Sequence, residues 1–591
     1  MKQADKRARL ERVHEGIPAS PGIAIGRAYL FVKDIPRIEQ RDLGSDGVED
    51  EIDRFNRAIE KSTKQLNKIL LFARQKMGDA KARIFEAQVM VLEDRILLDA
   101  VAERIRRERK NAEYIVSDEI GKYAHLMLAA RDEYMHERAH DIEDLKNRVI
   151  RILHEEKLVS RLEESVTVVA HALSATDTMI LARNHPLGYA TDKGGPLSHP
   201  ALIARSLGIP AVVALGDISR DVETGDMILL DGYSGTVVVN PSGERVAEYT
   251  RKRERMERFR ADLAELRDLP AVTTDGRSIE LSANIELPEQ LEYVVVQGSQ
   301  GVGLYRTESL LMERDDIPSE DEQYAEYKKV ADRLFPHRVI MRTFDIGGDK
   351  IAPEAAEEAN PFLGWRGIRI CIDRPDLFMN QLRAMLRASI RRNLAIMFPM
   401  VTTIGEVLKA KEFVEQAKSE LRESGAGFDE NIQLGVMIEV PTAALNARQI
   451  AAEVDFLSIG SNDLTQYLLA VDRGNNLVAR LYQTFDPGVL ATLKHVINAG
   501  HKEKKWVGIC GEMAGNTLAA PLLIGLGIDE LSVVPAVLPE IKKIVRSTSY
   551  ARMQEVAKEV LTFSTARETE AYLREFLKKE IPGLPLDDNS V

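Results

Sequence analysis

From residue 278 onward, short β-prone runs alternate with stretches of helical pattern. The eight runs lie at 278–284, 301–305, 338–345, 395–401, 434–440, 455–461, 506–512 and 529–535. Parallel strands need a crossover between neighbours, so eight such alternations favour a closed (β/α)8 barrel over residues 270–591. A doubly wound open sheet is the weaker alternative, because seven of the gaps have a helical pattern.

The first 241 residues have a different texture. Residues 17–32, "IPASPGIAIGRAYLFV", are β-prone and predict a strand or hairpin, and β-prone runs return from residue 166. Between them lies a charged segment with almost no glycine or proline, and its apolar residues recur at the three- and four-residue steps of amphipathic helices. The first residues of this pattern are Val48, Ile52, Phe55, Ile59, Leu66, Ile69 and Ala73.

We therefore expect a multidomain α/β protein. An α/β domain comprises residues 1–40 and 156–241, and a helical bundle over residues 41–155 is inserted into it. Residues 242–269 are intensely charged and have no strong apolar face. They predict a solvated helical linker to the barrel.

The net charge of −13 bears on the possible partners. Binding to a phosphate backbone needs a basic face, so this acidity disfavours nucleic acid. No apolar run is long enough to span a bilayer, and the basic N-terminus lacks the apolar region of a secretory signal, so we expect a cytoplasmic protein without a membrane partner. The two cysteines, Cys371 and Cys510, lie far apart, which argues against a disulfide framework or a cysteine zinc site.

Polar side chains follow strand after strand of the expected barrel. Catalytic groups of (β/α)8 barrels lie at the carboxyl ends of the strands, so we expect this set to surround one site. In chain order the set is Arg306, Arg342, Lys350, Glu439, Asn462, Asp463, Arg473 and Cys510.

The types of side chain in this set indicate a ligand. Three arginines and a lysine suit an anion with several oxygens. Glu439 and Asp463 offer hard oxygen ligands, and Mg²⁺ typically binds through one or two carboxylates plus substrate oxygens. The sequence thus predicts a small, highly charged anion bound with a divalent metal. If Cys510 faces that anion, it is a proton donor or a nucleophile; if it does not, it is a buried core cysteine. Cys371 is interpreted as structural.

A histidine stands out in "GGPLSHPALIARSLGIPAVV", residues 194–213. Ser198 is placed to cap a helix in which His199 takes the first position and Pro200 the second, and Gly208 suits the helix end. A helix N-terminus eases the placement of a phosphate and favours the neutral imidazole that attacks. On this stretch alone, a structural turn histidine and a phosphate-carrying nucleophile both remain open.

Long motifs occur in a characteristic order along nearly the whole chain. They are "ASPGIAIG", "RIFEAQVMVLEDRIL", "YMHERAHDIEDLKNRV", "GVGLYRTESLLMERDDIPSEDEQY", "RTFDIGGDK", "NPFLGWRGIRI", "MIEVPTAAL", "FLSIGSNDLTQYLLAVDRGN" and "WVGICGEMAGN". Together they resemble the Enzyme I family of the bacterial phosphoenolpyruvate:sugar phosphotransferase system, the phosphoenolpyruvate–protein phosphotransferases.

The resemblance implies a role for each domain. The α/β domain would be a swivelling phosphohistidine domain, the helical bundle would bind the small carrier protein HPr, and the barrel would bind phosphoenolpyruvate and form a homodimer. His199 would take the phosphoryl group and pass it to a histidine of HPr, in the first step of sugar uptake. We expect the linker to let the α/β domain swing between the barrel and HPr, and a protein crosslinked with the two domains apart to fail to autophosphorylate.

The resemblance also implies the site residues. Arg306, Arg342, Asn462 and Arg473 would hold phosphoenolpyruvate, and Cys510 would protonate the departing enolate to give pyruvate. Lys350 and Arg366 are further expected contacts of the substrate, and Asp463 is expected to contact it as well. Glu439 and Asp463 would hold Mg²⁺.

The loop before His199 departs from the family pattern. The family usually has an arginine and a threonine between the glycine pair and Ser-His and often a threonine after the histidine, where this chain has Pro196, Leu197 and Pro200. The loop of this chain resembles the phosphohistidine loops of dikinase-type relatives. Those relatives also need an ATP-grasp domain, for which the domains expected here leave no room. Two alternatives stay open: a weakened regulatory or scaffold protein that binds HPr-like partners, and a dikinase-like enzyme with another acceptor.

Overall fold

The described residues of the computed structural model form two compact units, which divide between Met256 and Glu257. The boundary falls within helix α9 (Gly243–Leu266). The structure describes residues 11–32, 38–44, 47–77, 79–128, 133–154, 165–196, 198–311, 317–347, 358, 360–475, 477–582 and 584–586. In these parts of the chain no helix is both long and apolar enough to cross a membrane.

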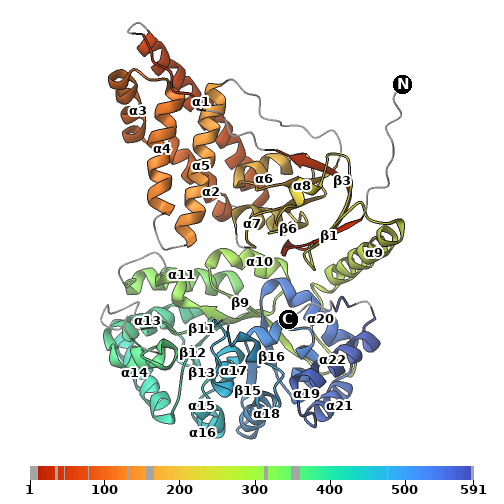
Figure 1. The fold of residues 1–591 in the computed structure, drawn as a ribbon. Helices are drawn as coiled ribbons and strands as arrows, with labels where there is room; N and C mark the ends of the chain where they lie inside the picture. Colours follow the sequence, from red (N-terminus) through yellow and green to blue (C-terminus); the bar gives the residue numbers. More distant parts are fainter. Residues whose placement is uncertain are drawn as a thin grey trace. The chain divides into compact units, whose positions relative to one another are not determined.

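The first unit contains an eight-stranded sheet in the order β1-β8-β7-β3-β4-β5-β6-β2, of which Figure 1 labels β1, β3 and β6. Strands β3 to β6 are parallel neighbours, and the other pairs are antiparallel. The strands are β1 (Arg12–Glu15), β2 (Ile17–Ser20), β3 (Ile23–Phe31), β4 (Thr167–Ala170), β5 (Gly188–Thr191), β6 (Ala211–Val213), β7 (Met227–Asp231) and β8 (Thr236–Val239).

The expected strand or hairpin at residues 17–32 is two strands that do not pair with each other. Both edges of β3 are occupied, one by β7 and the other by β4, so β2 pairs with β6 at the end of the sheet instead. The hairpin alternative is therefore wrong. Strand β3 instead joins the antiparallel half of the sheet to the parallel half.

Five helices lie between β3 and β4: α1 (Val48–Met77), α2 (Asp79–Leu92), α3 (Arg95–Glu108), α4 (Ala112–Leu128) and α5 (Glu133–Leu153). Helix α1 buries Val48, Ile52, Phe55, Leu66, Ile69 and Ala73, which confirms the amphipathic helix predicted from their spacing. The apolar core of the bundle continues into α6 (Ala175–Ala182) through Met179 and into α7 (His199–Ser206) through Ile203. The inserted bundle thus packs on the α/β part of its own unit.

The second unit is a closed barrel of eight parallel strands in the order β10-β11-β12-β13-β14-β15-β16-β9. The (β/α)8 prediction is confirmed, and the open doubly wound sheet is wrong. The strands are β9 (Glu280–Ile285), β10 (Gly301–Arg306), β11 (Arg338–Arg342), β12 (Leu394–Phe398), β13 (Gln433–Ile438), β14 (Phe456–Ile459), β15 (Trp506–Ile509) and β16 (Glu530–Val533).

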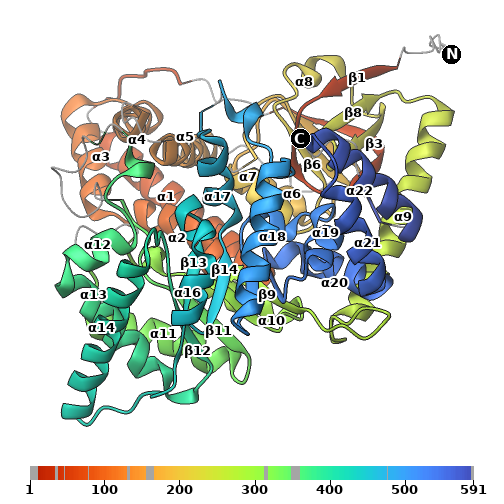
Figure 2. The ribbon, with the colours of Figure 1, turned by 90° about the horizontal axis from the view of Figure 1, so that it is seen from below.

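Helices surround these strands (Figures 1 and 2). They are α10 (Leu291–Val296), α11 (Glu320–Leu334), α12 (Ile368–Asp373), α13 (Pro375–Ala388), α14 (Ile404–Glu423), α15 (Pro441–Leu445), α16 (Ala447–Glu453), α17 (Ser461–Leu469), α18 (Pro487–Lys502), α19 (Ala519–Leu526), α20 (Leu538–Ser547), α21 (Tyr550–Val560) and α22 (Ala566–Glu580). The interior is filled by Leu304, Ile340, Ala395, Met397, Met437, Phe456 and Cys510. It is therefore a packed core, and the chemistry must lie at its ends.

Helix α9 confirms the helix expected over the charged segment 242–269, with one difference. It buries Met256 and Phe259, which are 7% and 5% exposed, so it is not solvated on all sides. These two residues lie one turn apart and make a short apolar stripe that the overall charge of the segment conceals in the sequence.

Candidate active site

Arg342 ends strand β11 and is held by two carboxylates. Its guanidinium donates to Glu308 at 3.0 Å and pairs with Asp345 at 3.1 Å. Burial alone would lower the pKa of Arg342, but Glu308 and Asp345 together raise it, so the guanidinium stays charged inside the barrel mouth.

Arg366 follows the short helix η6 (Pro361–Leu363) and bridges the same cluster. It donates to both oxygens of Asp345, at 2.8 and 3.1 Å, and to Asp463 at 3.2 Å. Burial would raise the pKa of Asp345, but the charges of Arg342 and Arg366 lower it, so this carboxylate is ionised and fixes both arginines. Arg306, at the end of β10, pairs in turn with Glu286.

Glu439 follows strand β13, and Asp463 lies in the first turn of α17 after β14. Glu439 is 2% exposed and accepts a hydrogen bond from the Met400 N–H at 2.6 Å. Burial and the negative charges of Asp345 and Asp463 raise the pKa of Glu439 to about 8, against the opposing effect of Arg342.

These two carboxylates fit a divalent cation. Glu439 is a buried acid crowded by other acids, and a bound cation would supply the positive charge that keeps it ionised. Among the described residues no group of three or more His, Cys, Asp or Glu side chains forms a complete metal cage. Two carboxylates completed by water and substrate oxygens are the ligand set that Mg²⁺ prefers.

Cys510 directly follows β15 and is 3% exposed. Its thiol lies 3.7 Å from the Ile459 carbonyl oxygen. Burial raises the pKa of Cys510 to about 11; Glu439 adds to the rise, and Arg342 and Arg306 oppose it. The thiol is therefore protonated and lies within the electrostatic reach of the arginine cluster. Cys371 is also fully buried, with its thiol 3.9 Å from the Phe344 carbonyl oxygen, as a structural cysteine should be.

Asn462 and Arg473 meet at Glu512. Asn462 donates to the Glu512 carboxylate at 3.1 Å and accepts from the Glu512 N–H at 2.8 Å, and Arg473 donates to the same carboxylate at 3.0 Å. Gly511 makes this approach possible, because a Cβ there would come within 1.9 Å of the Ser461 hydroxyl. The loop after β15 thus lies directly against the start of α17.

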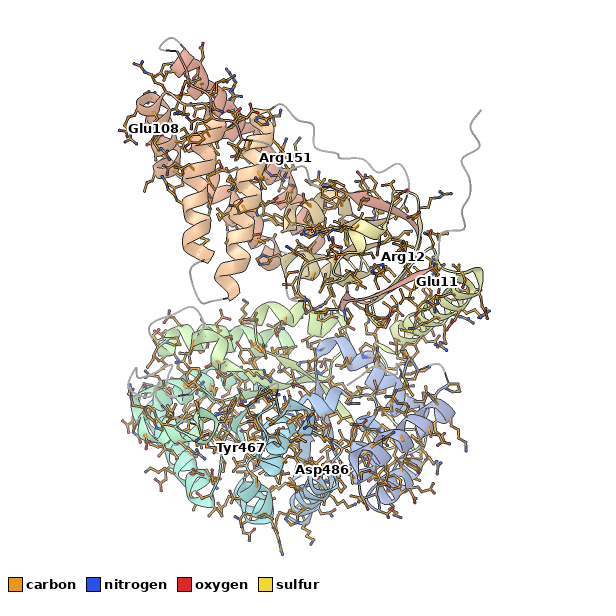
Figure 3. All side chains as sticks on the ribbon, viewed as in Figure 1. Glu11, Arg12, Glu108, Arg151, Tyr467 and Asp486 are labelled. Carbon is orange, nitrogen blue, oxygen red and sulfur yellow. The ribbon has the colours of Figure 1, made fainter. Side chains whose placement is uncertain are left out.

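Helix α17 is also fixed on its other side. The hydroxyl of Tyr467, labelled in Figure 3, donates to the Phe362 carbonyl of η6, the short helix that precedes Arg366. The structure thus brings Arg306, Arg342, Arg366, Glu439, Asp463 and Cys510 together and places Asn462 and Arg473 at one side of them. Lys350, the remaining residue predicted for this site, lies outside the described residues.

Sequence reasoning singled out Glu512 as a polar group after its strand, but it missed three other acids that hold the arginines: Glu286, Glu308 and Asp345. A signal for two of them exists. Glu308 follows Arg306 by two positions and Asp345 follows Arg342 by three, each just past a strand end. An acid so placed beside a strand-end arginine is a candidate for fixing the guanidinium.

His199 lies in the other unit, at the first position of α7, with Ser198 before it and Pro200 after it, as predicted. The predicted capping bond of Ser198 is absent: its hydroxyl donates to the Gly195 carbonyl at 2.8 Å and so tightens the preceding turn. Gly208 has φ = +67° after the helix, which glycine adopts without strain.

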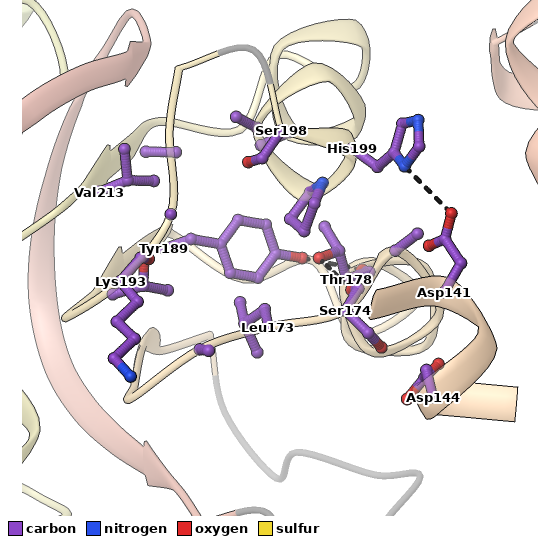
Figure 4. A pocket seen from close by; sticks show the side chains of 18 of the residues that line it. Asp141, Asp144, Leu173, Ser174, Thr178, Tyr189, Lys193, Ser198, His199 and Val213 are labelled. Carbon is purple, nitrogen blue, oxygen red and sulfur yellow. Dashed lines mark hydrogen bonds and ion pairs between the residues drawn. The ribbon is translucent and has the colours of Figure 1, made fainter. Parts of the chain in front are cut away.

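A carboxylate faces the imidazole. Asp141 of helix α5 lies 3.3 Å from Nδ1 of His199 (Figure 4). Both residues line a cavity of about 340 Å³, with Tyr189 and Leu173 among its apolar walls. The Tyr189 hydroxyl donates to the Thr178 carbonyl at 3.1 Å.

Family models match three parts of the chain. Residues 260–550 match the PEP-binding domain of PEP-utilising enzymes, residues 15–138 their N-terminal domain, and residues 162–235 their mobile domain. PEP stands for phosphoenolpyruvate. Together with the barrel and the unit that carries His199, the three matches make this chain a PEP-utilising enzyme.

Whole-length relatives narrow the class. The chain is 42% identical to the phosphoenolpyruvate-protein phosphotransferase of Staphylococcus carnosus, over 95% of this chain and 99% of the relative. It is 43% identical to that of Geobacillus stearothermophilus, over 95% and 98%. An NMR structure of an Enzyme I protein aligns with 41% of this chain and 99% of its own, at 41% identity and a TM-score of 0.38. The chain belongs to the phosphoenolpyruvate-protein phosphotransferase family.

Proposed function

We propose that the chain transfers the phosphoryl group of phosphoenolpyruvate to its own His199 and then to a histidine of the carrier protein HPr, releasing pyruvate. The observation that supports this most is the protonated, buried Cys510 beside the arginines at the barrel mouth. An enolate leaving group needs a proton at carbon, and a buried thiol beside an anion site supplies one.

The proposed reaction has two parts. The Nε2 lone pair of His199 attacks phosphorus, and an N–P bond forms as the bond from phosphorus to the enol oxygen breaks. The electron pair leaves with the enolate, Cys510 gives its proton to the methylene carbon, and pyruvate results. The thiolate of Cys510 then takes a proton from solvent.

The remaining groups of the barrel mouth bind and neutralise. Arg306, Arg342 and Arg366 would bind the phosphate and carboxylate oxygens, because guanidinium matches both. Phosphoryl transfer depends mainly on positioning and charge neutralisation. Glu439 and Asp463 would hold Mg²⁺, which when bound adds positive charge near the oxygens of the substrate.

Asn462 and Arg473 would complete the substrate site, since they lie together at its edge on Glu512. We also propose that the chain dimerises through the barrel. Large apolar side chains are exposed on loops and helix ends that follow its strands, namely Leu363, Leu445 and Leu477 at 65%, 72% and 84%. Exposed apolar groups of this size are typical of protein interfaces.

For HPr, the helical bundle is the proposed docking surface. Leu71, Met90 and Ile96, on α1, α2 and α3, are 65%, 67% and 77% exposed. Because His199 and the barrel belong to different units, α9 would let the histidine visit the barrel and HPr in turn. A role in sugar uptake follows if HPr is the acceptor.

A labelling experiment tests the proposal. The protein is mixed with Mg²⁺ and phosphoenolpyruvate labelled in its phosphate, with and without HPr, and the His199→Gln variant is the control. We expect acid-labile label on the wild-type chain, none on His199→Gln, and movement of the label to HPr. Label that stays on the chain would point to another acceptor, as in the dikinase-like alternative. No label would contradict the proposal and leave the regulatory alternative.

A further inference from the structure

We propose that Asp141 is a positioning residue for His199: its carboxylate accepts the Nδ1–H of the imidazole, fixes the tautomer in which Nε2 is the nucleophile, and stabilises the ring as it gains positive charge. The inference rests on the proposed phosphorylation of His199. It makes the helical bundle, which supplies Asp141, part of the catalytic site as well as a docking surface.

The geometry places one carboxylate oxygen 3.3 Å from Nδ1 of His199. The two side chains come from different segments, Asp141 from the middle of α5 and His199 from the first turn of α7. In Figure 4 the Asp141 carboxylate points at the imidazole, whereas Asp144, one turn along α5, does not. Within the described residues, His199 is the one cation-forming side chain within ion-pair distance of Asp141.

The burial of the pair strengthens the interaction. Side-chain exposure is 11% for Asp141 and 23% for His199, so water screens the contact only partly. The low exposure of both side chains therefore favours a direct contact between them over contacts with water.

The chemistry follows from the donor and acceptor inventory of the two groups. A neutral imidazole has a proton on one nitrogen only, and an ionised carboxylate can accept but not donate. A hydrogen bond across this 3.3 Å ion-pair contact would put the proton on Nδ1 and the lone pair on Nε2. When the N–P bond forms at Nε2, the ring becomes cationic while it retains the Nδ1 proton, and the adjacent carboxylate lowers the free energy of that charge.

A neighbouring arginine fixes the loop before His199. The Pro196 carbonyl accepts a hydrogen bond from Arg205 at 3.3 Å, and Arg205 also donates twice to the Ala19 carbonyl. That arginine is thus engaged in holding the loop, and Asp141 supplies a negative charge beside the imidazole.

The test compares Asp141→Asn with Glu143→Gln, in the full-length protein. Glu143 lies two residues away on α5, lines the same cavity and pairs with Lys146 at 2.6 Å, so its change removes the same charge from the same helix and leaves the Asp141–His199 contact in place. The first readout is the tautomer of His199, measured without substrate by long-range ¹H–¹⁵N NMR on histidine-labelled protein, with His199→Gln to assign the signal. The second is the rate of His199 phosphorylation against phosphoenolpyruvate concentration.

We expect Nδ1–H in the wild type and in Glu143→Gln, and a mixture of tautomers in Asp141→Asn. We expect phosphorylation of Asp141→Asn to slow by about 100-fold at saturating substrate, with little change in KM, because the substrate site is in the barrel. An Nε2–H tautomer in the wild type, or equal rates in the two variants, would overturn the inference. Failure of the wild type to take up phosphate would instead count against the proposed function, and the tautomer measurement would still test the contact.

Discussion

Replacement of Cys510 by alanine should separate phosphoryl transfer from pyruvate formation. With a pKa of about 11, the thiol is ionised in only about one molecule in 3,000 at pH 7.5, so nearly every molecule holds the proton that the enolate needs. A positioned proton donor typically contributes about 10²- to 10⁴-fold. We expect Cys510→Ala to lower the steady-state rate of pyruvate release by a factor in that range while the phosphorylation of His199 stays detectable in one turnover.

The assay follows pyruvate with lactate dehydrogenase and NADH, in parallel with labelled protein from rapid-quench samples. Cys371→Ala is the matched control, since it removes another buried thiol and costs a similar stability of about 1–2 kcal/mol. Thermal unfolding should show comparable losses for the two variants, and only Cys510→Ala should lose pyruvate release. Wild-type pyruvate release by Cys510→Ala would refute the assignment of the proton donor.

Three further predictions concern the barrel. Arg342→Lys should raise the KM for phosphoenolpyruvate about 10- to 100-fold in initial-rate assays. A lysine cannot keep the paired contacts to Glu308 and Asp345 and still present two parallel N–H donors to the substrate, as a guanidinium does. An unchanged KM would argue against contact between Arg342 and the substrate. Glu439→Gln should raise the Mg²⁺ concentration for half-maximal activity by about 10-fold or more, and chelation of Mg²⁺ should abolish activity in both proteins; an identical Mg²⁺ titration would contradict the ligand assignment. Burial and the charge of Glu280 raise the pKa of Glu530 to about 7, from 4.5 in the unfolded chain. Ionisation of Glu530 therefore opposes folding. The wild type should lose up to about 3 kcal/mol of barrel stability as the pH rises from 4.5 past 7. Glu530→Gln keeps an acceptor for the Ser282 hydroxyl and should raise the melting temperature at pH 8 but not at pH 5; equal shifts at both values would contradict the burial argument.

The barrel was predictable because each of its strands is a local pattern. Eight β-prone runs separated by helical spacing leave few other ways to bury their apolar residues, and the strand order follows from closure. The polar residues at the strand ends, such as Arg342 and Glu439, were predictable for the same reason, since the barrel fixes which ends share a face. The pairing of β2 was not predictable, because it depends on which edges of β3 other strands occupy.

Contacts between distant segments were also hidden in the sequence. Asp345 holds both Arg342 and Arg366, and only the folding of the η6 loop brings Arg366 to it. Asp141 meets His199 because the inserted bundle packs on α7, and no periodicity in either segment indicates that contact. Ser198 shows the limit of a local rule, since it takes the expected N-cap position and yet bonds to the preceding turn.

The phosphorylated residue is the most direct test of the account. The chain is incubated with Mg²⁺ and phosphoenolpyruvate, digested under alkaline conditions that preserve phosphohistidine, and mapped by tandem mass spectrometry. We expect one phosphate per chain, on Nε2 of His199, with an equal amount of pyruvate released before HPr is added. A phosphate on another residue, such as the exposed His171 beside Asp192, or pyruvate release without any phosphorylated peptide, would contradict it.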